Sequence, residues 1–477
     1  MIVLAIDQGT SATKALVVGP GNDVLGSAEV PVATHVVGRD GVEADPEELW
    51  QSVRAAGEQA LAIARATPDA VALANQGETV LAWDQATGKP LSRAIVWQDN
   101  RSAAVCARLG AAGAAEELRA LTGLPLDPYF AAPKMTWLRE NVTRDGVVTT
   151  TDTWLLHRLG ARYVTDAATA SRTMLLDLDA TTWSPRACEL FGIDPAAMPG
   201  VADCDAVAGE TTVFGGRQVP VAGIAVDQQA ALFGQGCRAR GDAKCTYGTG
   251  AFLLVTTGAS APRSTAGLSV SVAWRLSGSQ PAYCLDGQVY TAGSALRWLS
   301  SIGILDDPAE LDAVACTVPD SGGVVFVPAL AGLGAPHWAP DARGVLTGLQ
   351  LSTERGHIAR AVAEGIAASV AQLAGAVTAD MRAPLTALRA DGGLTRSRIL
   401  LQAQADLLQV PVHVSGTPHA TALGVAALAR LALGEADAGL TAGVAATVLP
   451  SVSKEISSER IAAFTAALQA ARTGGSA

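Results

Sequence analysis

A loop near the start of the chain combines an acid, glycine, hydroxyls and a lysine. Asp7-Gln8-Gly9-Thr10-Ser11-Ala12-Thr13-Lys14 lies between two apolar runs that read as strands. Glycine lets the backbone approach a phosphate, and hydroxyl and backbone N–H groups can bind its oxygens. Asp7, at the end of the first strand, is placed to hold Mg²⁺ through water. A polar hairpin turn has the same composition, so the loop alone leaves both interpretations open.

A second carboxylate, Asp227, follows the run 221–226, which is apolar enough to be a buried strand. Gln228 comes next, and a helix is expected over 230–236. A carboxylate held at the edge of a cleft can accept the proton of a substrate hydroxyl while that hydroxyl attacks the γ-phosphoryl group of ATP. A helix-capping role is the alternative for Asp227.

Two further glycine-rich segments are candidates for nucleotide loops. Gly248-Thr249-Gly250 and Asp391-Gly392-Gly393 each lie between a predicted strand and another regular element. Neither matches the Walker pattern, and no Gly-x-Gly-x-x-Gly opens a helix. The sequence therefore disfavours a P-loop or Rossmann fold.

The composition is that of a globular protein that handles small molecules. The 477 residues are 49% hydrophobic and 17% charged, and the net charge of −11 comes from scattered acids. Neither a nucleic-acid surface nor membrane attachment is expected, and no signal peptide is recognisable. Seven cysteines at wide spacings include no Cys-x-x-Cys pair, which argues against a disulfide framework or zinc site. We expect a cytoplasmic protein.

The elements that position these residues form two similar halves. Strands are predicted at 2–6, 15–18, 24–30, 71–74, 80–83 and 94–98, and a helix begins after Asp45, with Pro46 at its first position. In the second half, helices are predicted over about 353–380 and 396–408, with a short terminal helix after Ser451 and a disordered end. Strand meanders followed by helices predict α/β domains with mixed sheets, divided into residues 1–236 and 237–477.

Taken together, these segments resemble the FGGY family of carbohydrate kinases, and within it the members that phosphorylate glycerol. The resemblance runs almost end to end, and its ordered motifs are specific. It is carried by 5–10, 75–79, 94–98, 122–130, 152–155, 170–175, 227–235, 246–250, 332–336 and 391–393. It implies two actin-like, ribonuclease H-like domains that flank a central cleft for ATP and substrate.

The resemblance also implies roles for individual residues. Asp7 and Asp227 match the metal-associated aspartates, and Asp227 is also the catalytic base. Positions that match phosphate and nucleotide contacts are Thr10, Ser11, Lys14, Thr249, Gly293, Arg297, Gly392, Gly393 and Ser397. Positions that match acceptor contacts are Gly77, Glu78, Trp97, Tyr129, Asp227, Gln228 and Phe252. The expected cofactors are ATP and Mg²⁺, and the resemblance allows a homodimer or homotetramer.

The main departure from the family pattern is Gly77, where glycerol-phosphorylating members have an arginine that binds two substrate hydroxyls. The absence of that arginine removes charge-assisted hydrogen bonds of about 1.5–3 kcal/mol each and is expected to open space in the pocket. Another residue or water can restore glycerol binding, or the acceptor can be a tetritol, pentitol or ketopentose. Arg297 and Ser397 also replace a glutamine and an asparagine, which leaves the base selectivity open.

Two functions from different classes are consistent with the sequence. The first is an ATP-dependent kinase of a small polyol or sugar, with glycerol slightly ahead as acceptor because Glu78, Tyr129 and both aromatic walls are retained. The second is a sugar- or ATP-sensing protein that has lost catalysis. Asp7, Thr10 and Asp227 favour the kinase.

Overall fold

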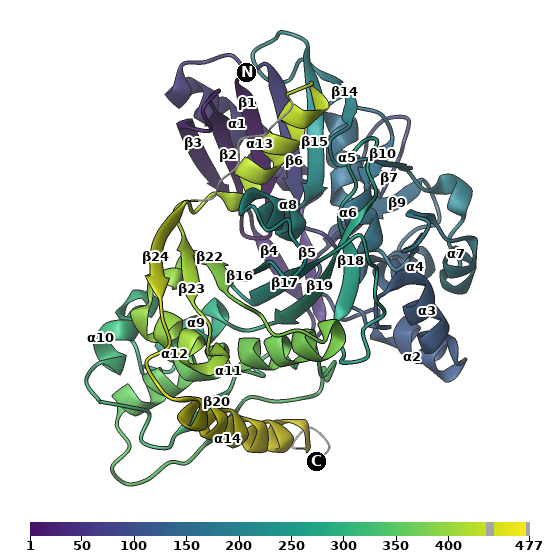
Figure 1. The fold of residues 1–477 in the computed structure, drawn as a ribbon. Coiled ribbons are helices and arrows are strands. Elements are labelled where there is room, and N and C mark those ends of the chain that lie inside the picture. The colour runs from purple at the N-terminus through teal and green to yellow at the C-terminus, as the bar shows by residue number, and fades with distance from the viewer. Residues whose placement is uncertain (436–442, 474–477) are drawn as a thin grey trace.

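The first of two large mixed sheets is built from the amino-terminal half of the chain. The protein, a computed structural model, is described over residues 1–435 and 443–473 (Figure 1). This six-stranded sheet has the order β14-β15-β6-β1-β2-β3. Its strands are β1 (Val3–Gln8), β2 (Ala12–Val18), β3 (Val24–Pro31), β6 (Ala70–Asn75), β14 (Val207–Thr211) and β15 (Val219–Val226). The antiparallel β1–β2–β3 meander continues into parallel pairs β1–β6 and β6–β15.

The second large sheet repeats this pairing scheme. Its order is β18-β19-β17-β16-β22-β23-β24. Its strands are β16 (Ala243–Tyr247), β17 (Ala251–Gly258), β18 (Ser269–Trp274), β19 (Ala282–Val289), β22 (Leu388–Asp391), β23 (Val412–Ser415) and β24 (Val444–Val448). From β19 to β24 the sequence of antiparallel and parallel pairs is the same as from β3 to β14. The prediction of two α/β domains with mixed sheets is therefore confirmed.

A smaller five-stranded sheet is inserted into the first half. It pairs β4 (Thr34–Val37), β5 (Gly41–Ala44), β8 (Ala94–Ile95), β7 (Val80–Trp83) and β9 (Val147–Thr150). Around it lie α2 (Ala103–Ala111), α3 (Ala114–Thr122), α4 (Ala131–Asn141), α5 (Thr151–Arg158) and α7 (Pro185–Phe191). The strand predicted over 94–98 ends early, because Asp99 N–H turns back to the carbonyl of Val96. This turn directs Trp97 out of the sheet.

Helix α1 (Pro46–Ala64) begins where the sequence predicts. The carboxylate of Asp45 accepts hydrogen bonds from the backbone N–H groups of Glu47 and Glu48, and Pro46 occupies the first turn. An N-cap of this kind satisfies donors that have no partner within the helix. The apolar face of α1 then covers β2 and β3 through Leu49 and Val53.

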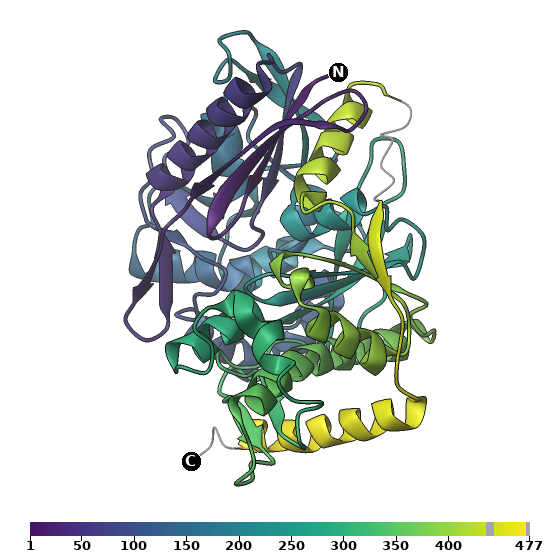
Figure 2. The same cartoon turned by 90° about the vertical axis from the view of Figure 1, so that its left-hand side faces the viewer.

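Helix α13 (Ala420–Ala432) links the two halves. It follows β23 of the second sheet, yet it packs on β1, β6 and β15 of the first sheet and on α8 (Asp227–Gly234), as Figure 2 shows beside the purple strands. The α8–α13 crossing is very close, since a Cβ at Gly234 or Gly424 would lie 2.0 Å from a carbonyl of the opposite helix. The predicted division at 236/237 stays a prediction, with α13 bridging it.

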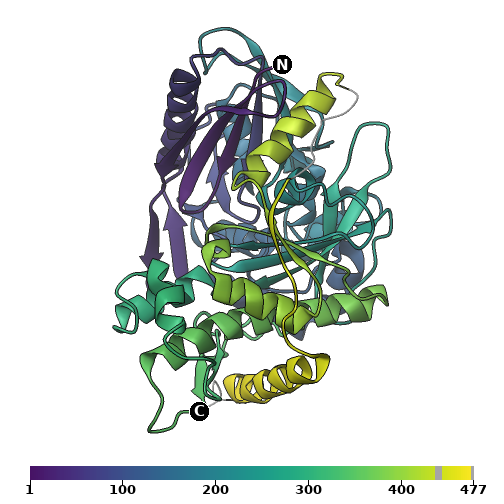
Figure 3. The ribbon, with the colours of Figure 1, turned by 60° about the vertical axis from the view of Figure 1, so that its left-hand side comes forward.

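The second sheet is covered by α11 (Arg355–Met381), which packs against β17 and β19 and against α12 (Arg398–Leu408) and α14 (Lys454–Thr473) (Figure 3). Helix α11 is long and apolar enough to cross a membrane, but 67% of its most apolar window is buried in the protein. It is a core helix. The predicted disordered end falls at residues 474–477, outside the described residues.

The remaining elements are short connections. They are β10 (Val164–Asp166), α6 (Ala167–Ser171), β11 (Leu176–Asp177), β12 (Thr182–Trp183), β13 (Gly200–Ala202), α9 (Gly293–Ser301), α10 (Leu311–Ala315), β20 (Val325–Val327) and β21 (Val345–Thr347). Helix α6 is entirely buried and leads directly into Arg172, which becomes important in the site described next.

Candidate active site

One wall of the site is formed where three parallel strands of the first sheet end. The strands β1, β6 and β15 are in register at Gln8, Asn75 and Val226. Because the carboxyl ends of parallel strands lie at one sheet edge, the residues that follow them meet there. Asp7 with the glycine loop, the segment 76–78 and Asp227 are therefore neighbours, although they are far apart in sequence.

The opposite wall is built in the same way by the second sheet. Strands β16 and β22 are parallel and pair Thr246 with Asp391, which places the loops at 248–250 and 392–393 next to each other. Gly392 has a φ of 93°, and a Cβ there would lie 2.4 Å from the carbonyl oxygen of Tyr247. Only glycine is compatible with this left-handed conformation and this close approach.

The two walls enclose a cleft of about 570 Å³. All the predicted site residues except Gly293 and Ser397 line it. They are Asp7, Thr10, Ser11, Lys14, Gly77, Glu78, Trp97, Tyr129, Asp227, Gln228, Thr249, Phe252, Arg297, Gly392 and Gly393. A cavity of this size is typical of a small-molecule site.

Gly293 and Ser397 do not line the cleft. Gly293 opens α9, and a Cβ there would be 2.7 Å from the carbonyl oxygen of Gly248, so this glycine supports the loop at 248–250. Ser397 caps α12, accepting from the N–H of Leu400 and donating to Asp312. Gly293 therefore contacts a cleft loop through its backbone, whereas the hydroxyl of Ser397 bonds within its own helix and to Asp312.

Asp227 is the first residue of α8, and its carboxylate takes part in a local network. Val226 occupies the N-cap position, and Asp227 Oδ1 accepts a hydrogen bond of 2.7 Å from the N–H of Gln228. The side chain of Gln228 is held by Lys244, whose Nζ donates to Gln228 Oε1 at 2.6 Å and to Thr246 Oγ1 at 2.8 Å. The helix start thus holds the carboxylate at the cleft edge.

Burial in the cleft raises the pKa of both Asp7 and Asp227. Loss of solvation raises the pKa of Asp227 to about 7, helped by the nearby carboxylates of Asp7 and Glu78 and opposed by Lys244. Loss of solvation likewise raises the pKa of Asp7 to about 6, opposed by Lys14. Both groups are thus poised to exchange protons near neutral pH, as a general base must.

The described residues contain no group of three or more His, Cys, Asp or Glu side chains that could by itself hold a metal ion. Asp7 nevertheless helps to raise the pKa of Asp227, because the two carboxylates lie near each other at the same sheet edge. Mg²⁺ usually binds one or two carboxylates and completes its shell with water and substrate phosphates. The pair fits such a cation.

A hydrogen-bond network joins the predicted phosphate loop to Trp97, the predicted acceptor wall. The indole N–H of Trp97 donates to Thr10 Oγ1 at 2.8 Å, and Thr10 Oγ1 donates to Gln76 Oε1 at 3.2 Å. Gln76 Oε1 also accepts from Thr79 Oγ1 at 3.0 Å, and Thr79 Oγ1 accepts from the backbone N–H of Trp97 at 3.3 Å. The side chain that forms the acceptor wall therefore also orients the hydroxyl of the phosphate loop.

We expect Trp97→Phe to raise the KM for both ATP and the acceptor. The change keeps an apolar ring but removes the N–H that holds Thr10, a loss of about 1 kcal/mol or roughly fivefold in kcat/KM. Initial rates with each substrate varied in turn measure it. Trp298→Phe is the control, because Trp298 stacks on Phe326 outside the cleft. An effect of Trp97→Phe on the acceptor alone would contradict the coupling.

Aromatic rings form a cage at the acceptor end of the cleft. Trp97 meets Tyr129 and Phe252 edge to face, with centroids 5.7 and 6.0 Å apart, and Tyr129 stacks on Tyr290 at 6.1 Å. Such rings offer flat apolar surfaces to the carbon chain of a polyol, while polar groups orient its hydroxyls. Tyr290 was not anticipated from the sequence.

The surroundings of Gly77 correct one expectation. Its missing side chain leaves no open space, because a Cβ at residue 77 would lie 2.8 Å from Cγ2 of Val226 and 3.9 Å from Cγ of Arg172. Val226 therefore fills the volume that a side chain at 77 would need. Residue 77 is not an arginine, but the side chain of Arg172 lies beside it.

Several cleft residues escaped the reasoning from sequence. Arg172, Asp286 and Gln76 are buried polar side chains that line the cleft, and Lys244 is a buried side chain that binds the cleft residue Gln228. Arg172 and Gln76 stand in segments that carry the family resemblance, which was the one signal available. Asp286 lies in an ordinary-looking strand, and only its ion pair with Arg172 distinguishes it.

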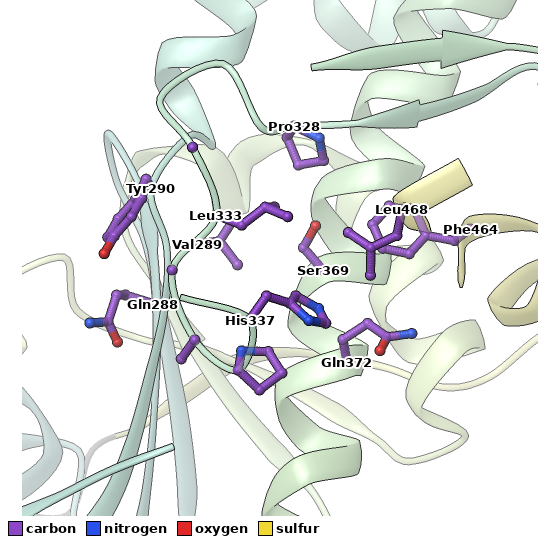
Figure 4. Close-up of a pocket in the computed structure, with 14 residues that line it drawn as sticks. Gln288, Val289, Tyr290, Pro328, Leu333, His337, Ser369, Gln372, Phe464 and Leu468 are labelled. Atoms are coloured by element: carbon purple, nitrogen blue, oxygen red, sulfur yellow. The ribbon is translucent and has the colours of Figure 1, made fainter. Parts of the chain in front are cut away.

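A second cavity lies between β19, the loop 328–337, α11 and α14. Figure 4 shows His337, Ser369 and Gln372 gathered around it, with Phe464 and Leu468 of α14 on one side. Its volume of about 20 Å³ is close to that of one water-sized probe. The cavity is too small for a substrate, and we assign it to packing.

Comparison with known proteins agrees with this geometry. Models of the amino-terminal and carboxy-terminal domains of the FGGY family of carbohydrate kinases match residues 2–234 and 243–433. A glycerol kinase of Alkalilimnicola ehrlichii is 43% identical over 99% of this chain and 98% of its own. One from Trichlorobacter lovleyi is 45% identical over 91% and 90%. The structure of Plasmodium falciparum glycerol kinase with ADP superimposes with a TM-score of 0.90 at 30% identity, covering 98% of both chains.

Proposed function

Because the chain belongs to the FGGY family of carbohydrate kinases, which are ATP-dependent phosphotransferases, we propose that it phosphorylates a terminal hydroxyl of a small polyol, with glycerol as the best single acceptor. The product would be glycerol 3-phosphate. The observation that carries the proposal is the meeting of Asp7, the loop at 9–11 and Asp227 at one sheet edge, in the same cleft as the aromatic cage.

In this proposal Asp227 is the catalytic base. Its carboxylate accepts the proton of the acceptor hydroxyl as the oxygen attacks the γ-phosphorus of ATP, and ADP leaves with the β–γ bridging oxygen. Glu78, Tyr129 and Gln228 orient the acceptor hydroxyls, while Trp97 and Phe252 hold its carbon chain. Closing of the two walls over the substrates would keep water away from the phosphoryl group.

The phosphate and nucleotide ends use backbone and hydroxyl groups. Thr10, Ser11 and Lys14 would bind the transferred phosphoryl group, with Asp7 and Asp227 holding Mg²⁺, which neutralises phosphate charge when bound. The loops at 248–250 and 392–393 would contact the nucleotide directly. The positions proposed for the nucleotide are Thr249, Arg297, Gly392 and Gly393, which line the cleft, together with Gly293 and Ser397, which do not.

Two further assignments belong to this proposal. We assign residues 1–236 to a domain that carries the acceptor and phosphate sites, and residues 237–477 to one that carries the nucleotide site. We also place the enzyme in the cytoplasm, as a homodimer or homotetramer that binds only small molecules.

The rate should fall in acid. We expect kcat/KM for the acceptor at saturating MgATP to rise between about pH 5.5 and 8, because Asp227, with a pKa of about 7, must be deprotonated to act as base. Below that pKa the rate should drop roughly tenfold per pH unit. A pH–rate profile tests this, and a rate independent of pH over this range would contradict it.

The test of the proposed function is ADP release with a panel of acceptors. Glycerol, erythritol, ribitol and D-xylulose are compared at saturating MgATP. Gly77 makes the longer acceptors a second candidate class, since the arginine of glycerol-phosphorylating members is absent. A protein that binds ATP or polyols in calorimetry but turns over none of them would instead be a non-catalytic sensor.

A further inference from the structure

Resting on the kinase function proposed above, we propose that Arg172 is the cation that binds acceptor hydroxyls in place of a side chain at residue 77. We further propose that its two carboxylate partners restrict the acceptor to uncharged polyhydroxy compounds. Arg172 would thus be a specificity-determining residue. It lines the same cleft as Gly77, Glu78 and Tyr129.

The first step is steric. Val226 Cγ2 lies 2.8 Å from the point where a Cβ at residue 77 would stand, a separation that real Cβ atoms do not show. The aliphatic part of Arg172 lies 3.9 Å from the same point. Residue 77 cannot project a side chain past Val226, and the nearest cation to that part of the pocket is Arg172.

The second step is the orientation of the guanidinium. Arg172 Nε donates to Glu78 Oε1 at 2.7 Å, and the group lies over the rings of Phe130 and Tyr129 at 5.2 and 5.7 Å. Stacking and a fixed hydrogen bond set the plane of the fork. Arg172 is therefore held in one orientation, with Nε and Nη1 beside the carboxylates of Glu78 and Asp286.

The third step is unused hydrogen-bonding capacity. Arg172 Nη1 lies 2.7 Å from Asp286 Oδ2, but its N–H groups do not point at that oxygen, and Nη1 is buried without a well-directed acceptor. A guanidinium has five N–H donors, and an unsatisfied buried donor is costly. A hydroxyl oxygen placed where Arg172 lines the cleft would accept from its guanidinium and donate its own proton to Glu78 or Asp286.

The fourth step is charge. Glu78 and Asp286 share the single guanidinium, so the cluster is acidic overall before a ligand arrives. Lys244, the other cation near Asp286, already donates to Gln228 and Thr246. The carboxylate of a sugar acid would compete with two carboxylates for one arginine and be repelled, whereas hydroxyls complement both partners.

The test compares glycerol with glycerate, and ribitol with ribonate, in an ADP-release assay. We expect the wild type to use the neutral member of each pair at least about 100-fold better, since like-charge juxtaposition costs several kcal/mol. Arg172→Lys should raise the KM for the neutral acceptor about tenfold, because lysine cannot reproduce the planar fork, while the KM for ATP changes less than twofold. Arg54→Lys, on an exposed helix face beside Glu58, is the matched control.

Asp286→Asn gives a readout that a purely structural role would not move. Removing one carboxylate should raise the glycerate-to-glycerol ratio of kcat/KM about tenfold. This variant also tests the site if Arg172→Lys does not fold in a thermal melt. An unchanged acceptor KM in Arg172→Lys, an unchanged ratio in Asp286→Asn, or efficient use of glycerate by the wild type would overturn the inference. Failure of the wild type with every neutral acceptor would instead overturn the proposed kinase function.

Discussion

Asp227→Asn is expected to lower kcat by about 10²–10⁴-fold, the range for loss of a general base. The amide keeps the size of the side chain, but it cannot take the proton from the acceptor hydroxyl. The acceptor KM should change little, because Glu78, Gln228 and the aromatic cage remain. Initial rates of ADP release with saturating polyol measure the effect, and the acid limb of the pH–rate profile should disappear with it.

The stability of this variant separates lost chemistry from lost folding. The folded protein raises the pKa of Asp227, so above pH 4 the ionised carboxylate disfavours the folded state, increasingly as pH rises toward 7. A neutral asparagine removes that cost, and the variant should melt at an equal or higher temperature than the wild type at pH 8. Asp145→Asn, at an exposed position before β9, controls for loss of a carboxylate. Wild-type turnover by Asp227→Asn would refute the assignment of the base.

The second large effect is expected for Asp7→Asn. This change should lower kcat/KM for MgATP on the order of 10²-fold and raise the Mg²⁺ concentration needed for half-maximal rate. The reason is that a neutral amide is a weaker ligand than a carboxylate for a hard cation. It also carries no negative charge to balance the positive charge of Mg²⁺. Rates at fixed ATP and varied Mg²⁺ distinguish the two parts of the effect.

The control for Asp7→Asn is Asp306→Asn, at an exposed position after α9. Both proteins should bind the neutral acceptor equally in calorimetry, since Asp7 lies at the phosphate end of the cleft. A variant that loses activity with an unchanged Mg²⁺ requirement would show that Asp7 acts without a metal. Retention of full activity at all Mg²⁺ concentrations would exclude Asp7 from the phosphate site.

Local signals in the sequence were sufficient for many elements. The cap at Asp45 and Pro46 places the start of α1 correctly, because capping depends on a few consecutive residues. The apolar runs before Asp7 and Asp227 are strands β1 and β15, since burial on both faces demands continuous apolar residues. The strand at 94–98 was predicted too long, because the turn at Asp99 depends on a backbone hydrogen bond rather than on residue type.

The site also has parts that local sequence predicts and parts that depend on tertiary packing. The ordered motifs identified the family, and the aspartates and most glycine-loop residues predicted from them line one cleft, because these positions are defined by residue type and local spacing. The packing of α13 on the first sheet could not be foreseen, since an apolar helix does not specify which sheet it covers.

The sequence by itself determined the family and predicted that Asp7, its glycine loop and Asp227 form the phosphate end of the site, and it left the acceptor end open at Gly77. Only the tertiary structure decided what surrounds that glycine. Val226 occupies the space, and Arg172, which directly follows α6, forms ion pairs there with Glu78 and Asp286. The physical reason is that contacts between residues 94 or more positions apart depend on how three strands and a buried helix pack, and no local pattern encodes them.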